Sequence, residues 1–439
     1  MIQTTPSEPN STQTEIEAGY DVLVIGAGPA GTTVAALVAE YGHRVLVLER
    51  APFPRFHLGE SLVPETYWTL ERLGVIDQLR QSDAPKKYSV QFVSDTGRES
   101  APFYFDDHKP GASAQTWQVV RGEFDQMLLK NAVAKGATAR TDAHVLDVLF
   151  DNNQATGVRV QLGSEAAEKD VREITAGVIV DATGQSAFLA NRLGLKQPDP
   201  LLKKGSVWTY FQGAQRDPGR DEGATIILQT EGKRSWFWYI PLANDIVSVG
   251  CTGDIDYIFG GGRSSPEEIF ARESARCEGL KRRLHTATRH TQFFTTKDFS
   301  YRATQAAGDG WVLVGDAFGF IDPVYSTGVL LALKSGEWAA DAIHNALQTD
   351  DLSAKQLGCW QAKYIDGLEL FAKLVHAFYA PGFSFGEFLR QHPQFRTNLV
   401  DMLIGDVFKP GLGEMFESMD DYLLPTDIGD GSVSRSARD

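Results

Sequence analysis

The sequence predicts an α/β (α+β) fold with a parallel layer, an antiparallel sheet and a helical carboxy-terminal region. Three observations indicate this class. Residues 20–50 have the pattern of a strand, a glycine-rich turn, a helix and a second strand, which is a βαβ unit. Residues 201–296 contain aromatic and β-branched runs separated by polar turns, a pattern typical of antiparallel strands. Residues 346–428 have mostly helical patterns.

The elements between these three parts follow in order along the chain. After the βαβ unit we expect a helix at residues 66–79, a strand end followed by an amphipathic helix within 119–137, and strands at 143–150, 155–162 and 177–184. The later segments predict a helical insertion at 265–285, a buried strand before residue 315 and an Ala/Leu-rich helix at 328–347. The aromatic segment 378–395 is expected to be helical, either as a substrate lid or as an aromatic face packed on the first domain.

The composition is that of an ordinary globular protein. The 439 residues are 42% hydrophobic and 23% charged, enough for two connected domains. The net charge of -15 argues against nucleic acid or an anionic membrane as the main partner. No apolar run reaches the ~20 residues of a membrane span. Because Cys251, Cys277 and Cys359 lie far apart, we expect reduced thiols, no metal site and a cytoplasmic location.

The turn after the first strand has the sequence GAGPAG at residues 26–31. Gly26 permits the turn, Gly28 lets a pyrophosphate approach the backbone, and Gly31 lets helix and strand pack closely. The helix that follows directs unpaired N–H groups and a favourable dipole at the phosphates. Glu49 ends the second strand, where a carboxylate can accept hydrogen bonds from ribose hydroxyls. The segment therefore predicts a Rossmann-like dinucleotide site.

Later motifs indicate which dinucleotide binds. Gly315 and Asp316 follow one apolar strand, the segment from Asp181 to Gly184 ends another, and Arg121 begins a helix. Together they resemble the marks of the para-hydroxybenzoate-hydroxylase-like FAD monooxygenase superfamily. This resemblance implies FAD, with Asp316 at the ribityl chain and Arg121 near the ribityl or pyrophosphate region. A helix-capping role is the alternative for Asp316.

The expected FAD contacts are Gly26, Gly28, Ala30, Gly31, Glu49, Arg50, Ser61, Arg121, Asp181, Gly184, Gly315 and Asp316. No second GxGxxG motif lies between a strand and a helix, so a stable NAD(P)H domain is not expected.

Two further motifs resemble those of the flavin-dependent halogenases. Residues 236–241, WFWYIP, match the pattern WxWxIP, and residues 320–328 match FxxPxxSxG. The resemblance implies that Trp236, Trp238, Pro323 and Ser326 lie near the flavin, where the tryptophans block ordinary monooxygenation. Two tryptophans at i and i+2 share one face of a strand, so core packing is the alternative for that pair.

The second of these motifs ends in a possible anion site. Ser326, Thr327 and Gly328 precede a helix that begins at Val329, and a helix start presents backbone N–H groups that can hold an anion. The resemblance implies a halide, chloride or bromide, bound by Thr327 and Gly328. An ordinary Ser/Thr helix cap is the alternative.

A lysine in the segment APKKYSVQF is the expected catalytic residue. The family places its catalytic lysine at a similar interval before a small-apolar strand, and counting back from Phe92 selects Lys87 over Lys86. Burial in a closed tunnel would lower the pKa of such a lysine and let it bind hypohalous acid. A solvated lysine is the alternative for either residue.

The resemblance implies halogenation of an electron-rich aromatic compound in natural-product biosynthesis. FADH2, supplied by a separate flavin reductase, would react with O2 to give a C4a-hydroperoxide, the halide would become hypohalous acid, and Lys87 would direct it to the substrate. Tryptophan halogenases have a glutamate where this chain has Tyr325, so a phenol or pyrrole, free or tethered to a carrier protein, is expected. The motif GESLVP at 59–64 also resembles geranylgeranyl reductases. An aromatic hydroxylase and a geranylgeranyl-reductase-like enzyme are the alternatives.

The predicted domain boundaries follow from these assignments. The FAD-binding domain is expected to be discontinuous, at 19–200 and 297–345, with residues 85–118 contributing to the substrate region. The expected remaining parts are a substrate-domain sheet at 201–296, a helical region at 346–428, a disordered leader at 1–18 and a disordered tail at 429–439.

Overall fold

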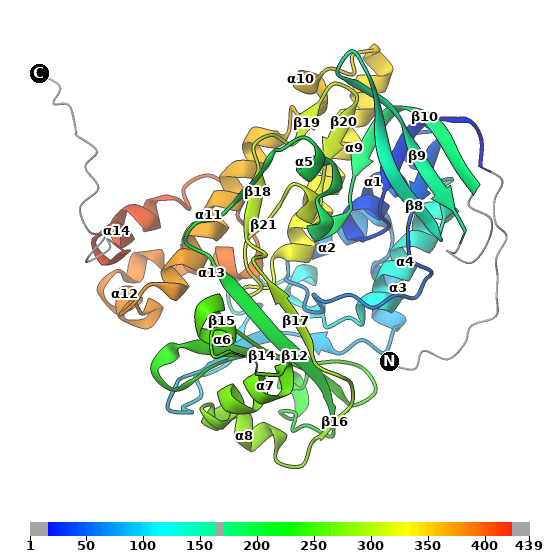
Figure 1. Cartoon of the computed structure of the whole chain (residues 1–439). Coiled ribbons are helices and arrows are strands. Elements are labelled where there is room, and N and C mark those ends of the chain that lie inside the picture. Colours follow the sequence, from blue (N-terminus) through cyan, green and yellow to red (C-terminus); the bar gives the residue numbers. More distant parts are fainter. Residues whose placement is uncertain (1–15, 164–169, 263, 424–439) are drawn as a thin grey trace, which may run out of the picture.

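The computed structural model describes residues 16–163, 170–262 and 264–423 (Figure 1). All but the last residues of the predicted leader at 1–18, and the whole predicted tail at 429–439, lie outside the described residues. Within the described part of the chain, no helix is long and apolar enough to cross a membrane.

A parallel sheet forms the centre of the first domain. Its strands run, in spatial order, β20 (Trp311–Leu313), β10 (Asp170–Asp181), β1 (Gly19–Ile25), β2 (Val45–Leu48) and β7 (Thr138–Arg140), and all neighbouring pairs are parallel. β2 is wholly buried, as expected for a strand with both faces covered. Because β20 comes from late in the chain, this domain is assembled from separated segments.

Three helices pack together beside the parallel sheet (Figure 1). α1 (Pro29–Glu40) contacts both α4 (Arg121–Ala134) and α9 (Gly328–Thr349). The approach of α9 is close, since a Cβ atom at Gly336 would lie 2.7 Å from the carbonyl oxygen of Ala30. The glycine therefore lets the interior of α9 pack closely against the start of α1. Other elements of this domain are β8 (Ala143–Asp151), β9 (Gln154–Leu162), β19 (Ala307–Gly308), α2 (Thr66–Leu73), α3 (Ile76–Gln81) and α5 (Phe188–Arg192).

A second sheet is mostly antiparallel. Its order is β16 (Thr288–Arg289), β12 (Lys204–Gln212), β15 (Ile246–Asp254), β14 (Ser235–Pro241), β13 (Thr225–Gln229), β4 (Ser89–Val93) and β5 (Phe103–Tyr104), with β17 (Phe294–Lys297) also paired to β12. The β13–β4 pair is parallel. β4 and β5 come from the first third of the chain, so residues 89–104 extend the sheet formed by the later strands.

Every residue of β14 is buried, because the sheet is covered on both faces. Phe237 and Tyr239 belong to a core cluster with residues of α7 (Pro266–Ala275) and α8 (Glu278–Leu284). Trp236 and Trp238 belong instead to the core cluster shared with the first domain. The alternation of a strand thus divides the WFWYIP segment between two faces.

The remaining elements are small sheets and the carboxy-terminal helices. β3 (Lys86–Lys87) pairs with β6 (Thr116–Trp117), and β18 (Tyr301–Ala303) pairs with β11 (Lys196–Pro198) and β21 (Gly319–Phe320). The helices are α6 (Ile255–Phe259), α10 (Ala354–Leu357), α11 (Gln361–Tyr379), α12 (Phe385–Gln391), α13 (Arg396–Ile404) and α14 (Glu414–Leu423). In Figure 1, α11, α12, α13 and α14 lie together on one side of the molecule.

Two expected helices are interrupted. The segment 66–79 is broken at Gly74, whose φ of 76° ends α2 before α3 begins. The aromatic segment 378–395 is likewise not one helix, because α11 ends at Tyr379 and α12 begins at Phe385. Gly382, with a φ of 78°, lies in the turn between them. The turn lets Phe383, Phe385 and Phe388 cluster with one another.

Candidate active site

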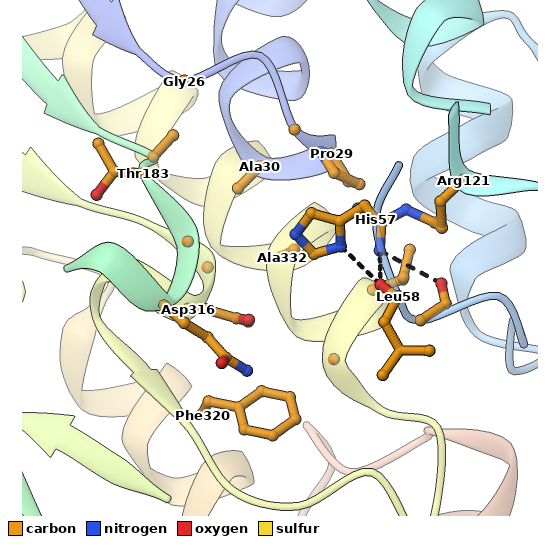
Figure 2. A pocket seen from close by; sticks show the side chains of 18 of the residues that line it. Gly26, Pro29, Ala30, His57, Leu58, Arg121, Thr183, Asp316, Phe320 and Ala332 are labelled. Atoms are coloured by element: carbon orange, nitrogen blue, oxygen red, sulfur yellow. Dashed lines mark hydrogen bonds between the residues drawn. The ribbon is translucent and has the colours of Figure 1, made fainter. Parts of the chain in front are cut away.

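A cavity of about 650 Å³ lies between the parallel sheet and the second sheet. Of the residues expected to contact FAD or to lie near it, the cavity is lined by Gly26, Gly28, Ala30, Glu49, Arg50, Ser61, Arg121, Gly184, Gly315, Asp316, Trp238, Pro323, Ser326 and Gly328. Gly31, Asp181, Trp236, Thr327 and Lys87 are not among the lining residues. Figure 2 shows Asp316 and Phe320 on one side of this cavity and His57 and Arg121 on the other.

The glycines at the start of α1 leave room for a diphosphate. Gly26 has a φ of 103°, and Gly28 caps the helix with no side-chain hydrogen bond. The first amides of α1 therefore face the cavity without a competing side chain. Gly31 acts through packing, since a Cβ atom there would lie 2.1 Å from the carbonyl oxygen of Gly26. These features fit a dinucleotide whose phosphates approach the backbone.

Glu49 is held in place by backbone N–H groups. Its two carboxylate oxygens accept hydrogen bonds from the backbone of Ala27 and Ala51, each at 3.0 Å. Oε1 keeps a lone pair that a ribose hydroxyl can use. Arg55 lies between this carboxylate, at 3.5 Å, and that of Asp125, at 3.1 Å. Arg55 also lines the cavity, and no sequence motif pointed to it.

Arg121 is fixed by a bidentate pair. Its guanidinium donates to both oxygens of Asp125, at 2.8 and 3.1 Å, and to the carbonyl oxygen of Leu58 at 2.7 Å. Burial raises the pKa of the Asp316 carboxyl group to about 7, and the positive charge of Arg121 partly offsets this rise. Asp316 thus faces the cavity as an acceptor or donor for a polar ligand chain.

Asp181, another expected FAD contact, does not line the cavity. Its carboxylate accepts hydrogen bonds from the backbone of Thr183 at 2.9 Å and of Leu189 at 2.7 Å. It organises the turn after β10, and the turn residues Thr183 and Gly184 line the cavity in its stead. A motif can therefore mark a cofactor site through the residue that shapes the turn rather than through a direct contact.

Lys87 is buried and its neighbour Lys86 is exposed, because consecutive residues of a strand face opposite sides. The ammonium nitrogen of Lys87 donates to the hydroxyl of Ser61 at 2.9 Å and to the carbonyl oxygen of Leu62 at 3.0 Å. It lies 5.6 Å from the centre of the Phe105 ring. Burial lowers the pKa of Lys87 to about 7, so the group changes charge near neutral pH.

A chain of hydrogen bonds joins Lys87 to the wall of the cavity. The Ser61 hydroxyl lies 2.8 Å from that of Thr225, which accepts a hydrogen bond from the Gln118 amide at 2.8 Å. Ser61 and Thr225 both line the cavity. Lys87 therefore lies directly behind the cavity wall, one side chain away from the open space.

The two tryptophans of the WFWYIP segment have different surroundings. Trp238 lines the cavity, and its indole N–H donates to Ser248 at 3.2 Å. Trp236 donates instead to the Tyr379 hydroxyl at 2.8 Å, and Tyr379 donates to Asp322 at 3.1 Å. Trp236 thus connects the second sheet to the end of α11 and to the loop before α9.

That loop, residues 320–328, has the geometry of an anion site. Ser326 has a φ of 57°, a left-handed conformation that is unusual for a residue other than glycine. In the described part of the chain, the backbone N–H groups of Thr327 and Gly328 are bonded to no protein acceptor. Asp322 supports the turn by accepting from the backbone of Val324 at 2.9 Å. Successive free amides after a left-handed residue form a nest that suits a halide.

The parallel sheet, the glycine turn at a helix start and the adjoining cavity define an FAD-binding protein. A model of the FAD binding domain family matches residues 19–347. The chain is 30% identical to the 1H-pyrrole-2-carbonyl-[peptidyl-carrier protein] chlorinase of Pseudomonas fluorescens, over 91% of this chain and 92% of that one. It is 29% identical to the corresponding brominase of Pseudoalteromonas luteoviolacea, over 89% and 92%.

A solved structure agrees with these relatives. The flavin-dependent brominase Bmp2 superposes with a TM-score of 0.81 at 29% identity, over 92% of this chain and 99% of that one. The chain belongs to the flavin-dependent halogenases. The predicted fold class, the use of FAD, halide and O2, and halogenation of an electron-rich aromatic compound are thereby confirmed.

Proposed function

We propose that this halogenase acts on a pyrrole-type ring presented as a thioester on a carrier protein. One observation carries this choice of substrate: the relatives named for carrier-bound pyrrole match this chain over nearly its whole length and theirs. A phenolic ring, free or carrier-bound, is the other outcome that the test below separates. FAD, when bound and reduced, supplies the oxidising chemistry by activating O2.

In this proposal the amides of Thr327 and Gly328 bind the halide. The free N–H groups and the left-handed Ser326 support this role. Gly328 lies close to the Phe320 ring, since a Cβ atom there would lie 3.3 Å from it. The absent side chain at Gly328 leaves room for a compact anion beside the Phe320 ring.

Lys87 is the catalytic residue of the proposal. Hypohalous acid leaves the cavity past Ser61 and Thr225 and is held by the Lys87 amino group, which hydrogen-bonds it or carries it as a haloamine. The burial of Lys87 and its lowered pKa support this role, because the neutral amine is the nucleophilic form. The aromatic ring is then halogenated beside Lys87 with water excluded.

We further propose that a separate flavin reductase supplies FADH2 in the cytoplasm. The sequence holds one strand-embedded GxGxxG motif, which leaves no second stable site for a nicotinamide cofactor. The thiols of Cys251, Cys277 and Cys359 are free, as is usual in a reducing compartment.

A product assay by mass spectrometry tests the substrate. The enzyme is supplied with FAD, a flavin reductase, NADH, O2 and chloride or bromide, and is offered pyrrole-2-carboxylate and 4-hydroxybenzoate, each both free and as a carrier-protein thioester. A halogen isotope pattern on the carrier-bound pyrrole alone is the expected result. Halogenation of the phenol alone would contradict the pyrrole assignment, and halogenation of free acids would contradict the carrier.

Tyr379→Phe tests how the halide loop is held in place. The change removes the hydrogen bonds to Trp236 and Asp322 without opening a cavity, and one buried hydrogen bond is worth about 0.5–1.5 kcal/mol. We expect the KM for bromide to rise about 3- to 10-fold while FAD affinity stays unchanged. Tyr364→Phe, a buried tyrosine on the same helix that bonds to α9 instead, is the control. An unchanged halide KM in Tyr379→Phe would show that the loop does not depend on this contact.

A further inference from the structure

Glu60 is a buried acid in the wall of the cavity that the FAD and lysine motifs do not explain. The segment around it runs alongside residues 117–119, with Ser61 bridged to Gln118 and the Glu60 carbonyl oxygen accepting from Val119 at 2.7 Å. Ser61 contacts Lys87, and Glu60 lines the cavity with Trp208 and Trp238. The consecutive residues Glu60 and Ser61 therefore connect the FAD cavity with Lys87.

The carboxyl group of Glu60 is only half satisfied. Its Oε1 accepts a hydrogen bond from the Tyr210 hydroxyl at 2.5 Å. Its Oε2 is buried and, among the described residues, has no hydrogen-bond partner. The groups that act on it are Tyr210 of β12, Ser248 of β15 and the charge of Arg121 of α4, which makes its own bidentate pair with Asp125. A buried carboxylate oxygen without a donor is unfavourable, whereas a protonated one is itself a donor.

The formation of hypohalous acid in the FAD cavity requires a proton. Formation of hypohalous acid consumes halide, O2, FADH2 and one proton, and yields hypohalous acid, FAD and one water. The O–O bond breaks and an O–halogen bond forms, while the halide and FADH2 each lose two electrons and O2 gains four. Halogenation of the ring then exchanges a ring hydrogen for the halogen and releases the second water. The net uptake of one proton therefore belongs to the step that takes place in the FAD cavity.

We propose that Glu60 is the proton donor of this step: it stands neutral in the FAD-loaded enzyme and gives the proton on Oε2 to the oxygen atom that leaves as water. Tyr210 then stabilises the carboxylate through its hydrogen bond to Oε1, and solvent returns the proton before the next turnover. The proposal rests on halogenation at this cavity and adds an acid to the roles of Lys87 and the halide loop.

The titration of Glu60 supports this role. Burial raises its pKa to about 7, against the effects of Tyr210, Ser248 and Arg121, which lower it. An acid with a pKa near the working pH is both protonated often enough and strong enough to transfer its proton.

Infrared spectroscopy and the product yield of Glu60→Gln test the proposal together. In the wild-type enzyme with oxidised FAD, carbonyl bands of protonated carboxyl groups are expected to disappear between pH 6 and pH 9, because burial raises the pKa of Asp316 and Asp322 to about 7 as well as that of Glu60. The Glu60 band is the one that the wild type has and Glu60→Gln lacks, so the difference spectrum between the two enzymes isolates it. The same variant should bind FAD with unchanged affinity and yield about 10²-fold less halogenated product per FADH2 consumed. Glu273→Gln, a fully buried glutamate outside the cavity lining, is the matched control and should retain both band and yield.

Tyr210→Phe provides a second variant if Glu60→Gln does not fold. Loss of the hydrogen bond to the charged carboxylate should move the infrared titration to higher pH. A wild-type spectrum without this band, or a Glu60→Gln enzyme with wild-type yield, would overturn the proposal. If the wild-type enzyme halogenates a ring other than pyrrole, the substrate assignment fails while the infrared titration and the yield ratio still report on Glu60.

Discussion

Lys87→Met is expected to abolish halogenation while leaving FAD bound. Methionine has a similar volume and keeps the packing on Phe105, but it cannot bind or carry hypohalous acid. We expect halogenated product to fall by at least about 10²-fold, because the oxidant would no longer be held beside the ring. Mass spectrometry of the product and a flavin fluorescence titration measure the two effects. A Lys87→Met enzyme that halogenates normally would remove Lys87 from the mechanism.

Lys86→Met is the matched control for this prediction. Lys86 is exposed on the opposite side of β3, so its loss should leave the activity unchanged. Equal losses in both variants would point to a disturbed β3–β6 pair rather than to a catalytic amine.

Lys87→Met and Lys86→Met also test how the stability of the protein depends on pH. Lys87 has a pKa of about 7 in the folded protein and an ordinary pKa near 10.4 in the unfolded chain, so above pH 7 the unfolded state binds more protons. The contribution of Lys87 to the free energy of unfolding therefore rises with pH between these two values and stays constant, at its most unfavourable, below pH 7. The difference in stability between Lys87→Met and wild type should shift by about 2–3 kcal/mol in favour of the wild type from pH 6 to pH 9. Chemical denaturation at both pH values measures it, and Lys86→Met should show no such shift.

The comparison of Lys86 with Lys87 also shows what sequence reasoning could establish. The family interval selected Lys87, and the strand geometry gives a physical reason, because only one of two consecutive lysines can face inward. The glycine turn, the strands of the second sheet and the loop before α9 were equally visible, since each depends on residues close together in sequence. Local patterns of this kind predict the fold class, and most of the residues expected to contact FAD line the cavity.

Other features could not be predicted because their partners lie far apart in the chain. Arg55 acts through Asp125, Glu60 through Tyr210, and Trp236 through Tyr379. The motifs that contain Glu60 and Trp236 do not reveal these partners, and only the packing of the segment after β2, α4, the second sheet and α11 brings the pairs together. The break of the aromatic segment 378–395 was missed for another reason, since its helical pattern does not reveal that the chain turns at Gly382.

Gly28→Ala, in the glycine-rich turn before α1, is expected to cause the second large effect, a loss of FAD affinity. A Cβ atom at residue 28 would have the Arg55 guanidinium as its nearest neighbour, at 3.7 Å, and the φ of -77° is open to alanine. The protein without FAD should therefore fold with a stability within about 0.5 kcal/mol of wild type. The methyl group would stand where the pyrophosphate approaches the backbone, so we expect FAD affinity to fall about 10- to 100-fold through lost hydrogen bonds to a charged group.

Gly31→Ala separates this effect from packing. Its Cβ atom would lie 2.1 Å from the Gly26 carbonyl oxygen and 3.0 Å from both Ala182 and Val24, which are fixed parts of the turn and the sheet. Helix α1 would have to move away from β1, so we expect a loss of stability of about 1–3 kcal/mol even without FAD. Thermal unfolding of both variants without FAD, followed by flavin titration, distinguishes them. If Gly28→Ala binds FAD as tightly as wild type, the phosphates do not approach the backbone at residue 28, and Arg55 with the later amides of α1 would have to hold them instead.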